Sequence, residues 1–135
     1  MTDDLLINRQ LMKDLLSQIT DPDENVRHEA TEALALIVSD SDWRPAELIE
    51  ENGIITIVEL LGEKNPHILS SALDIIIATA DAGEEEELIS AGTIASLDAL
   101  QDHDDPGIRG KVKQALWMLE PQVEDTVISK PQDEY

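Results

Sequence analysis

The chain has 135 residues, which is long enough for one domain with a hydrophobic core. Its 30 acidic and 9 basic residues give a formal net charge of -21, and a surface of this charge repels DNA, RNA and anionic membranes. Hydrophobic residues make up 41% of the chain and Phe is absent, so the core must consist mainly of Leu, Ile, Val and Ala, which favours stacked helices over a sheet sandwich. The absence of cysteine excludes disulfides and thiolate chemistry.

The N-terminal segment predicts a helix over about residues 3–19. Thr2 and the two aspartates after it can cap a helix, and apolar residues then recur at helical spacing. The segment lacks the basic start and apolar run of a secretory signal, and the longest apolar run of the chain, DIIIATA, is too short to span a bilayer. We therefore expect a cytoplasmic protein with no membrane partner.

A stop-and-restart signal at Asp21-Pro22-Asp23-Glu24 predicts the start of a second helix, with Asp as the cap and Pro22 in the first turn. Its apolar residues have the spacing 0, +4, +7, +8, +11, which is typical of one buried helical face. They are Val26, Ala30, Ala33, Leu34 and Ile37. Residues 38–45 form a connection, in which Trp43 is predicted to fill the junction with the following unit.

The stretch from Glu47 to Ala80 predicts three helical pieces. A short helix is broken by Gly53, a second ends at Gly62, and a third begins at Asn65-Pro66. The third piece repeats the stripe of the preceding helix, with Ile68, Ala72, Ile75, Ile76 and Thr79.

The same three-part pattern returns about forty residues later. A short helix over 84–89 ends before Gly92, and a second helix is predicted over 93–101. A third begins at Asp105-Pro106 and is expected to stop at Pro121. Its stripe is Ile108, Val112, Ala115, Leu116 and Leu119.

Alignment of the two later units gives offsets of 39 to 40 residues, with Gly53 matching Gly92. The first unit aligns about 42 residues upstream but lacks the short first helix. A period near forty indicates an α-solenoid, because one such unit cannot bury its own apolar face and must stack on its neighbour. We predict a repeat domain over residues 1–120 and a flexible, acidic C-terminal tail over 121–135. The apolar residues of the tail either form a short linear motif or fold back over the last unit.

Two stretches, ELIEENGIITIVELLGEKNPHILSSALDIII and ELISAGTIASLDALQDHDDPGIRGKVKQALWML, resemble armadillo repeats. A third, LLSQITDPDENVRHEATEALALI, resembles a HEAT repeat, and the three together cover roughly residues 4–120. The resemblance implies an all-α, right-handed α-solenoid of about two and a half to three repeats, in which the third helices line a concave groove. It also implies a role in holding extended peptides or helices of other proteins.

Armadillo proteins that import cargo, such as importin alpha, carry a Trp two residues before and an Asn two residues after the main core Leu of each third helix. The corresponding pairs here are Glu32 and Leu36, Asp74 and Ala78, and Gln114 and Met118. These Trp and Asn pairs are absent from all three units, which puts recognition of nuclear-localisation peptides in that manner in doubt. Acids at two of the Trp positions still leave a groove that attracts Lys and Arg.

The helix face opposite each core stripe is the predicted partner-binding surface. It comprises His28, Glu29, Glu32, Leu36, Ser70, Ser71, Asp74, Ala78, Lys111, Gln114, Trp117 and Met118. We hypothesise that this strip binds a basic protein segment; the alternative is an ordinary solvated face. Trp117 is either an end cap covered by the tail or an anchor for a partner.

No residue pattern indicates a catalytic, cofactor or metal site. The three histidines have no Cys or second His at ligand spacing, and neither a Gly-rich elbow around a Ser nor a phosphate-cradling loop occurs. Arg27 with Asp21 resembles the pair that ties loop to helix in HEAT repeats, which is a structural role.

A binding module without enzymatic activity is therefore the expected function. A structural or adaptor subunit is the alternative, in which the exposed ends of the stack self-associate or dock a larger assembly. A role as a chaperone cofactor is a weaker alternative that rests on the fold only. The oligomeric state and the identity of the partner stay open.

Overall fold

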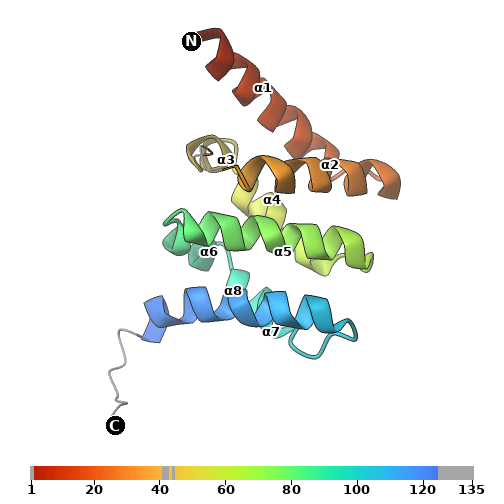
Figure 1. Cartoon of the computed structure of the whole chain (residues 1–135), viewed down its shortest axis with the longest axis vertical. Helices are drawn as coiled ribbons and strands as arrows, with labels where there is room; N and C mark the ends of the chain where they lie inside the picture. The colour runs from red at the N-terminus through yellow and green to blue at the C-terminus, as the bar shows by residue number, and fades with distance from the viewer. Residues whose placement is uncertain (1, 41–42, 44, 125–135) are drawn as a thin grey trace.

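A computed structural model describes residues 2–40, 43 and 45–124 of the chain (Figure 1). The helices, in order, are α1 (Thr2–Gln18), α2 (Glu24–Val38), α3 (Ala46–Glu50), α4 (Gly53–Glu59), the 3-10 helix η1 (Leu60–Gly62), α5 (Pro66–Asp81), α6 (Glu85–Ser90), α7 (Thr93–Asp98) and α8 (Pro106–Glu124). No strand occurs in this described part of the chain. The prediction of an all-α solenoid is confirmed.

The long helices α2, α5 and α8 lie side by side, one above the other along the stack (Figure 1). The short helices α3, α4, α6 and α7 lie behind them and form a second layer (Figure 1). The helix α1 packs on α2 and also touches α3. Two three-helix units follow a two-helix start, as the repeat pattern predicted.

Each long helix begins with an N-cap side chain of the same kind. The N-cap side chains of Asp23 and Asn65 accept hydrogen bonds from backbone amides of the first turns of α2 and α5. Asp105 does the same for α8, accepting from the Gly107 amide at 2.7 Å. These bonds satisfy amide groups that have no partner within the helix, so the start of each long helix is fixed locally.

The core runs through the whole stack along the apolar stripes of the long helices. Leu34 and Ile76 are fully buried and Leu116 is 5% exposed. The short helices contribute buried residues such as Leu48 and Leu97 from the second layer. Since apolar burial is the main favourable term in folding, this continuous core binds each unit to its neighbours.

The turn between the first and second helix of a unit places one residue in the left-handed region. This residue is Asn52 (φ 59) in the second unit and Gly92 (φ 86) in the third. Asn is among the few residues other than Gly that tolerate this conformation. The predicted match of Gly53 with Gly92 was therefore wrong by one residue: Gly53 is a buried first residue of α4, and its space is limited by Leu48.

Two predicted boundaries also differ from the structure. The helix α7 ends at Asp98 rather than Gln101, because the chain continues as turns. The helix α8 continues through Pro121 to Glu124, so the prediction that Pro121 stops it was wrong. A proline removes one backbone hydrogen bond, which a helix can lose near its end. Residues 121–124 of the predicted tail (121–135) therefore belong to α8, and the part from residue 125 onward lies outside the described residues.

Trp43 is half-buried and packs against the core, in agreement with the predicted role at the first junction. Within the described residues, no helix combines the length and apolar character that crossing a membrane requires.

Candidate functional site

The predicted binding residues lie on α2, α5 and α8, which form one layer of the molecule (Figure 1). Their flanking core residues are buried, so the strip is positioned by the same periodicity that builds the core. Exposure differs along it. Glu29, Glu32, Leu36, Asp74, Gln114 and Trp117 are exposed, whereas His28, Ser70, Ser71, Ala78, Lys111 and Met118 are half-buried.

An open groove of about 570 Å³ lies between α2 and α5. Five of the predicted residues line it: Glu32, Leu36, Ser71, Asp74 and Ala78. The groove has two chemical characters, because carboxylates from adjacent helices stand beside an exposed leucine and small apolar side chains. Such a surface suits a basic side chain with an aliphatic stem.

Lys111 modifies the charge of this surface. Its ammonium group lies 2.9 Å from Asp74 Oδ1 and donates a hydrogen bond to Ser70 Oγ at 2.7 Å. The pair joins α8 to α5 and balances part of the charge of Asp74, whose side chain is 47% exposed. The Glu32 side chain is 61% exposed. Among the described residues its one ion-pair contact is with His28, whose Nε2 lies 3.5 Å from Glu32 Oε2.

His28 and His67 stack their rings across the first junction, with centroids 5.5 Å apart. This contact lies near the start of α2 and α5, at one end of the strip. Among the residues that the structure describes, no three His, Cys, Asp or Glu side chains gather in a way that could hold a metal ion.

The α8 part of the strip is less enclosed than the α2–α5 part. Gln114 is exposed, Trp117 is 74% exposed and Met118 is half-buried against the core. None of these three lines the groove between α2 and α5. The structure therefore divides the predicted strip into a groove and a more open end.

The predicted pairing of Arg27 with the carboxylate of Asp21 needs correction. The guanidinium donates to the backbone carbonyl of Asp21 at 2.9 Å, and its ion pair is with Glu63 of the next unit, where Nε and Oε2 are 2.9 Å apart. The role is structural, as expected, but it joins two repeats as well as a loop and a helix.

Sequence reasoning missed three residues that line the groove: Ala35, Val38 and Ser39. They lie after the main core leucine of α2, in the last turn of the helix and at its C-cap. The signal for two of them was available in the helical spacing, since Ala35 follows Glu32 by three residues and Ser39 follows Leu36 by three.

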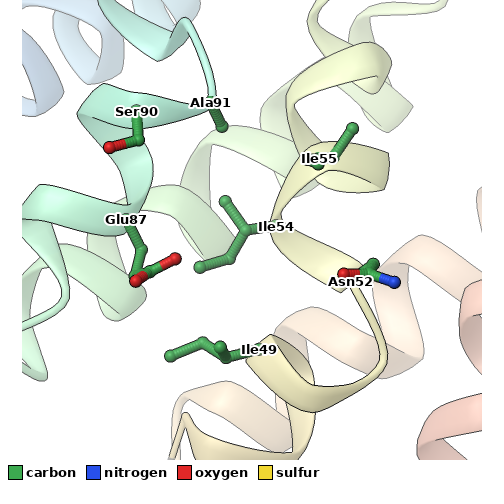
Figure 2. Close-up of a pocket in the computed structure, with 7 residues that line it drawn as sticks. All are labelled: Ile49, Asn52, Ile54, Ile55, Glu87, Ser90 and Ala91. Carbon is green, nitrogen blue, oxygen red and sulfur yellow. The ribbon is translucent and has the colours of Figure 1, made fainter.

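A smaller pocket of about 130 Å³ lies in the second layer (Figure 2). Figure 2 shows Ile54 projecting from α4 toward Glu87 of α6. The sequence did not indicate this pocket, because its walls come from short helices of two different units. Its small volume argues against a site for a drug-sized ligand.

Comparison with known proteins gives matches in structure. No protein-family model matches the sequence. No curated protein matches it either. A solved engineered protein is similar with 26% identity and a TM-score of 0.75, over 82% of this chain and 46% of that one.

Designed armadillo repeat proteins are similar as well. One, in complex with the peptide (KR)4, has 25% identity and a TM-score of 0.74 over 80% of this chain and 46% of that one. Another, computationally designed for modular peptide recognition, has 24% identity and a TM-score of 0.72 over 77% of this chain and 44% of that one. The chain spans less than half of the length of each of these proteins. It has an armadillo-type helical-repeat fold.

Proposed function

We propose that this chain is a protein-interaction module that binds a basic, extended segment of a partner protein along α2, α5 and α8. The observation that carries the proposal is the groove in which Glu32 of α2 and Asp74 of α5 stand beside the exposed Leu36. A Lys or Arg side chain placed there meets a carboxylate at its tip and apolar surface along its stem. No bond is made or broken in this function.

Charge supports a basic partner. The chain has a formal net charge of -21, which attracts cationic segments at long range and accelerates their association. The structurally similar designed protein that holds the peptide (KR)4 has the same type of fold. That likeness supports a peptide of alternating basic residues as the first ligand to test.

The expected affinity depends on several weak contacts acting together. Each exposed ion pair contributes only about 0.2–1 kcal/mol, so a single Lys on Glu32 does not suffice. A peptide that crosses α2 and α5 gathers ion pairs with Glu32 and Asp74, and on α8 it meets the exposed Gln114 and Trp117. Since the contacts are exposed, binding should weaken as salt is added.

Lys111 should oppose this binding. It holds Asp74 at 2.9 Å, so an incoming cation must displace it or share the carboxylate. Replacing Lys111 with Met keeps the apolar stem, removes the competing charge and should tighten binding of a basic peptide. The control Lys113→Met makes the same change in net charge at an exposed site of α8, so a larger gain for Lys111→Met separates a groove that uses Asp74 from a general attraction.

The test is a titration of a fluorescently labelled peptide of alternating Lys and Arg, followed by anisotropy at low and moderate salt. The groove variant combines Glu32→Lys with Asp74→Lys. Its control combines Glu59→Lys with Asp98→Lys, which makes the same change in net charge at exposed sites on α4 and α7.

We expect the groove variant to weaken binding at least about tenfold, which corresponds to roughly 1.4 kcal/mol, and the control to change it much less. Equal losses in both variants would show that only net charge matters, and would remove the groove from the function. Lack of any binding by the unaltered chain at low salt would also contradict the proposal.

A further inference from the structure

Arg27 joins the first two repeats. Its Nη1 donates to the backbone carbonyls of Asp21 and Pro22, in the loop before its own helix, at 2.9 and 3.0 Å. Its Nε lies 2.9 Å from Oε2 of Glu63, in the corresponding loop of the next repeat. One arginine therefore fixes its own loop and pairs with the loop that follows.

Arg109 repeats the first half of this arrangement in α8. It occupies the same helix position as Arg27, and its Nη1 donates to the backbone carbonyls of His103 and Asp104 at 2.6 and 3.1 Å. The helix α8 is the last that the structure describes, so the described residues contain no following loop with a counterpart of Glu63. Arg109 is exposed, and among the described residues its Nε and Nη2 have no hydrogen bond or ion pair.

Asp21 supplies the matching acid at the other end of the stack. It stands two residues before the N-cap of α2, as Glu63 stands two residues before the N-cap of α5. The start of the stack therefore offers the group that would complete the contact of Arg109 at its end.

The ion pair between α5 and α8 also has an equivalent pair of residues at the two ends of the stack. Lys111 lies 2.9 Å from Asp74 across that junction. By helix position, Gln114 of α8 corresponds to Asp74, and Glu29 of α2 corresponds to Lys111. Both side chains are exposed, and the amide of Gln114 can donate to the carboxylate of Glu29. In that pair the earlier helix carries the donor, whereas in the α5–α8 junction the later helix carries it.

The two most exposed large apolar side chains among the described residues occupy helix positions that meet in the junction between α2 and α5. Leu36 and Trp117 are each 74% exposed, more than the other large apolar side chains described. Trp117 has the helix position of Ala35, which lines the α2–α5 groove together with Ala78. Leu36 has the position of Ala78, so a further junction of the same geometry brings the indole onto the leucine.

We propose that the end of the stack formed by α8 docks on the start of a second copy of this chain, against α2, in the arrangement by which α5 follows α2 within one chain. Three pairs result, namely Arg109 with Asp21, Gln114 with Glu29, and Trp117 with Leu36. Two contacts of the first junction have no counterpart. Pro106 occupies the position of Glu24, which pairs with Asn65. Gly110 and Asn25 occupy the positions of the stacked His28 and His67.

The helix α1 packs on α2 but leaves Glu29 and Leu36 exposed. The contact is heterologous, so successive copies add in one direction and extend the strip of long helices. The net charge of -21 opposes association of two copies at low salt. Added salt therefore strengthens it, which is the reverse of its expected effect on basic-peptide binding.

The test is the mass of the full chain by sedimentation equilibrium, without peptide, over a wide concentration range at low and moderate salt. The monomer has a mass of 14.9 kDa. We expect Trp117→Ser to weaken association at least about tenfold, as for a central aromatic anchor. The matched control, Ile55→Ser, removes a 56% exposed apolar residue from α4 and should leave association unchanged.

A charge exchange tests the register itself. Gln114→Glu should weaken association, because it places two carboxylates together. Adding Glu29→Lys to it should restore association to at least the original strength, beyond the sum of the two single effects. Additive effects would reflect net charge and would contradict the register.

A mass of 14.9 kDa at every concentration overturns the proposal, and leaves Trp117 to a different protein or to residues 125–135. Association that is lost in Ile55→Ser but kept in Trp117→Ser overturns it as well, since it places the contact on the second layer. Neither result bears on peptide binding in the groove, which is measured separately.

Discussion

The contribution of the Arg27–Glu63 pair to stability can be isolated, because Arg109 provides a natural control within the same chain. Both arginines donate from Nη1 to two loop carbonyls, and the ion pair to the next repeat is the contact that Arg27 has in addition among the described residues. The side chains of Arg27 and Glu63 are 21% and 18% exposed. This places the pair between a surface and a buried salt bridge.

The magnitudes follow from these contacts. Removal of one partner from a buried pair costs about 3–5 kcal/mol and a surface pair contributes about 0–1, so we assign about 2 kcal/mol to the loss of the partly buried pair. Loss of the two hydrogen bonds to loop carbonyls, which are exposed except for the part-buried bond from Arg27 to Asp21, adds about 1 kcal/mol in either variant. We therefore expect Arg27→Ala to lower the free energy of unfolding by about 3 kcal/mol and Arg109→Ala by about 1 kcal/mol.

Urea unfolding followed by circular dichroism measures both variants, at a concentration where the unaltered chain is monomeric. The slope of the free energy with urea should also fall for Arg27→Ala if the first unit separates from the others, since repeat stability is a sum of unit and interface terms. A double-mutant cycle with Glu63→Gln isolates the coupling. Equal destabilisation by the two arginine variants, or a coupling near zero, would refute the reasoning.

Three further predictions concern the packing that holds the strip in place. Gly53→Ala should destabilise the chain by about 1–3 kcal/mol, because the new Cβ would stand 3.0 Å from the Leu48 carbonyl oxygen and press on its side chain, whereas Gly62→Ala, with open space around it, should be nearly neutral in thermal unfolding. Asn65→Ala should cost about 1–2 kcal/mol in urea unfolding through loss of the α5 cap, and an unchanged midpoint would contradict this. Ile76→Ala should cost about 2–5 kcal/mol, since the residue is fully buried; a cost below about 1 kcal/mol would show that the core between α2 and α8 collapses to fill the space.

Local pattern was sufficient to predict the helices and their order. The stripes around Leu34, Ile76 and Leu116 and the start of α5 at Asn65-Pro66 depend on residues within two turns of one another, so spacing alone indicates them. The cap of α2 was expected at the Asp before Pro22, but it is Asp23, and Pro22 precedes the helix. The helix break was predicted at Gly53 and matched with Gly92, but the residue with positive φ is Asn52, because Asn tolerates this conformation and Gly53 is packed closely against Leu48. The end of α8 was missed since Pro121 weakens a helix without always ending it.

The candidate site was predictable only in part. Helical spacing indicated that Glu32, Leu36 and Asp74 share an outward face, and the structure places these three in one groove. Whether they bind a partner stays a prediction. That Lys111 holds Asp74 was not predictable, because the two atoms belong to helices whose relative rotation no local pattern specifies.

The sequence by itself determined which residues are helical, which face of each helix is apolar and that the units repeat, because all three follow from short-range periodicity. The tertiary structure decided which charges meet. The Arg27–Glu63 contact spans 36 residues and the Lys111–Ser70 contact spans 41. Such contacts depend on the translation and rotation from one unit to the next, which are fixed by the summed packing of the core between units. The same translation and rotation leave Leu36 and Trp117 exposed. The equivalent positions in the α2–α5 junction are occupied by the smaller Ala78 and Ala35.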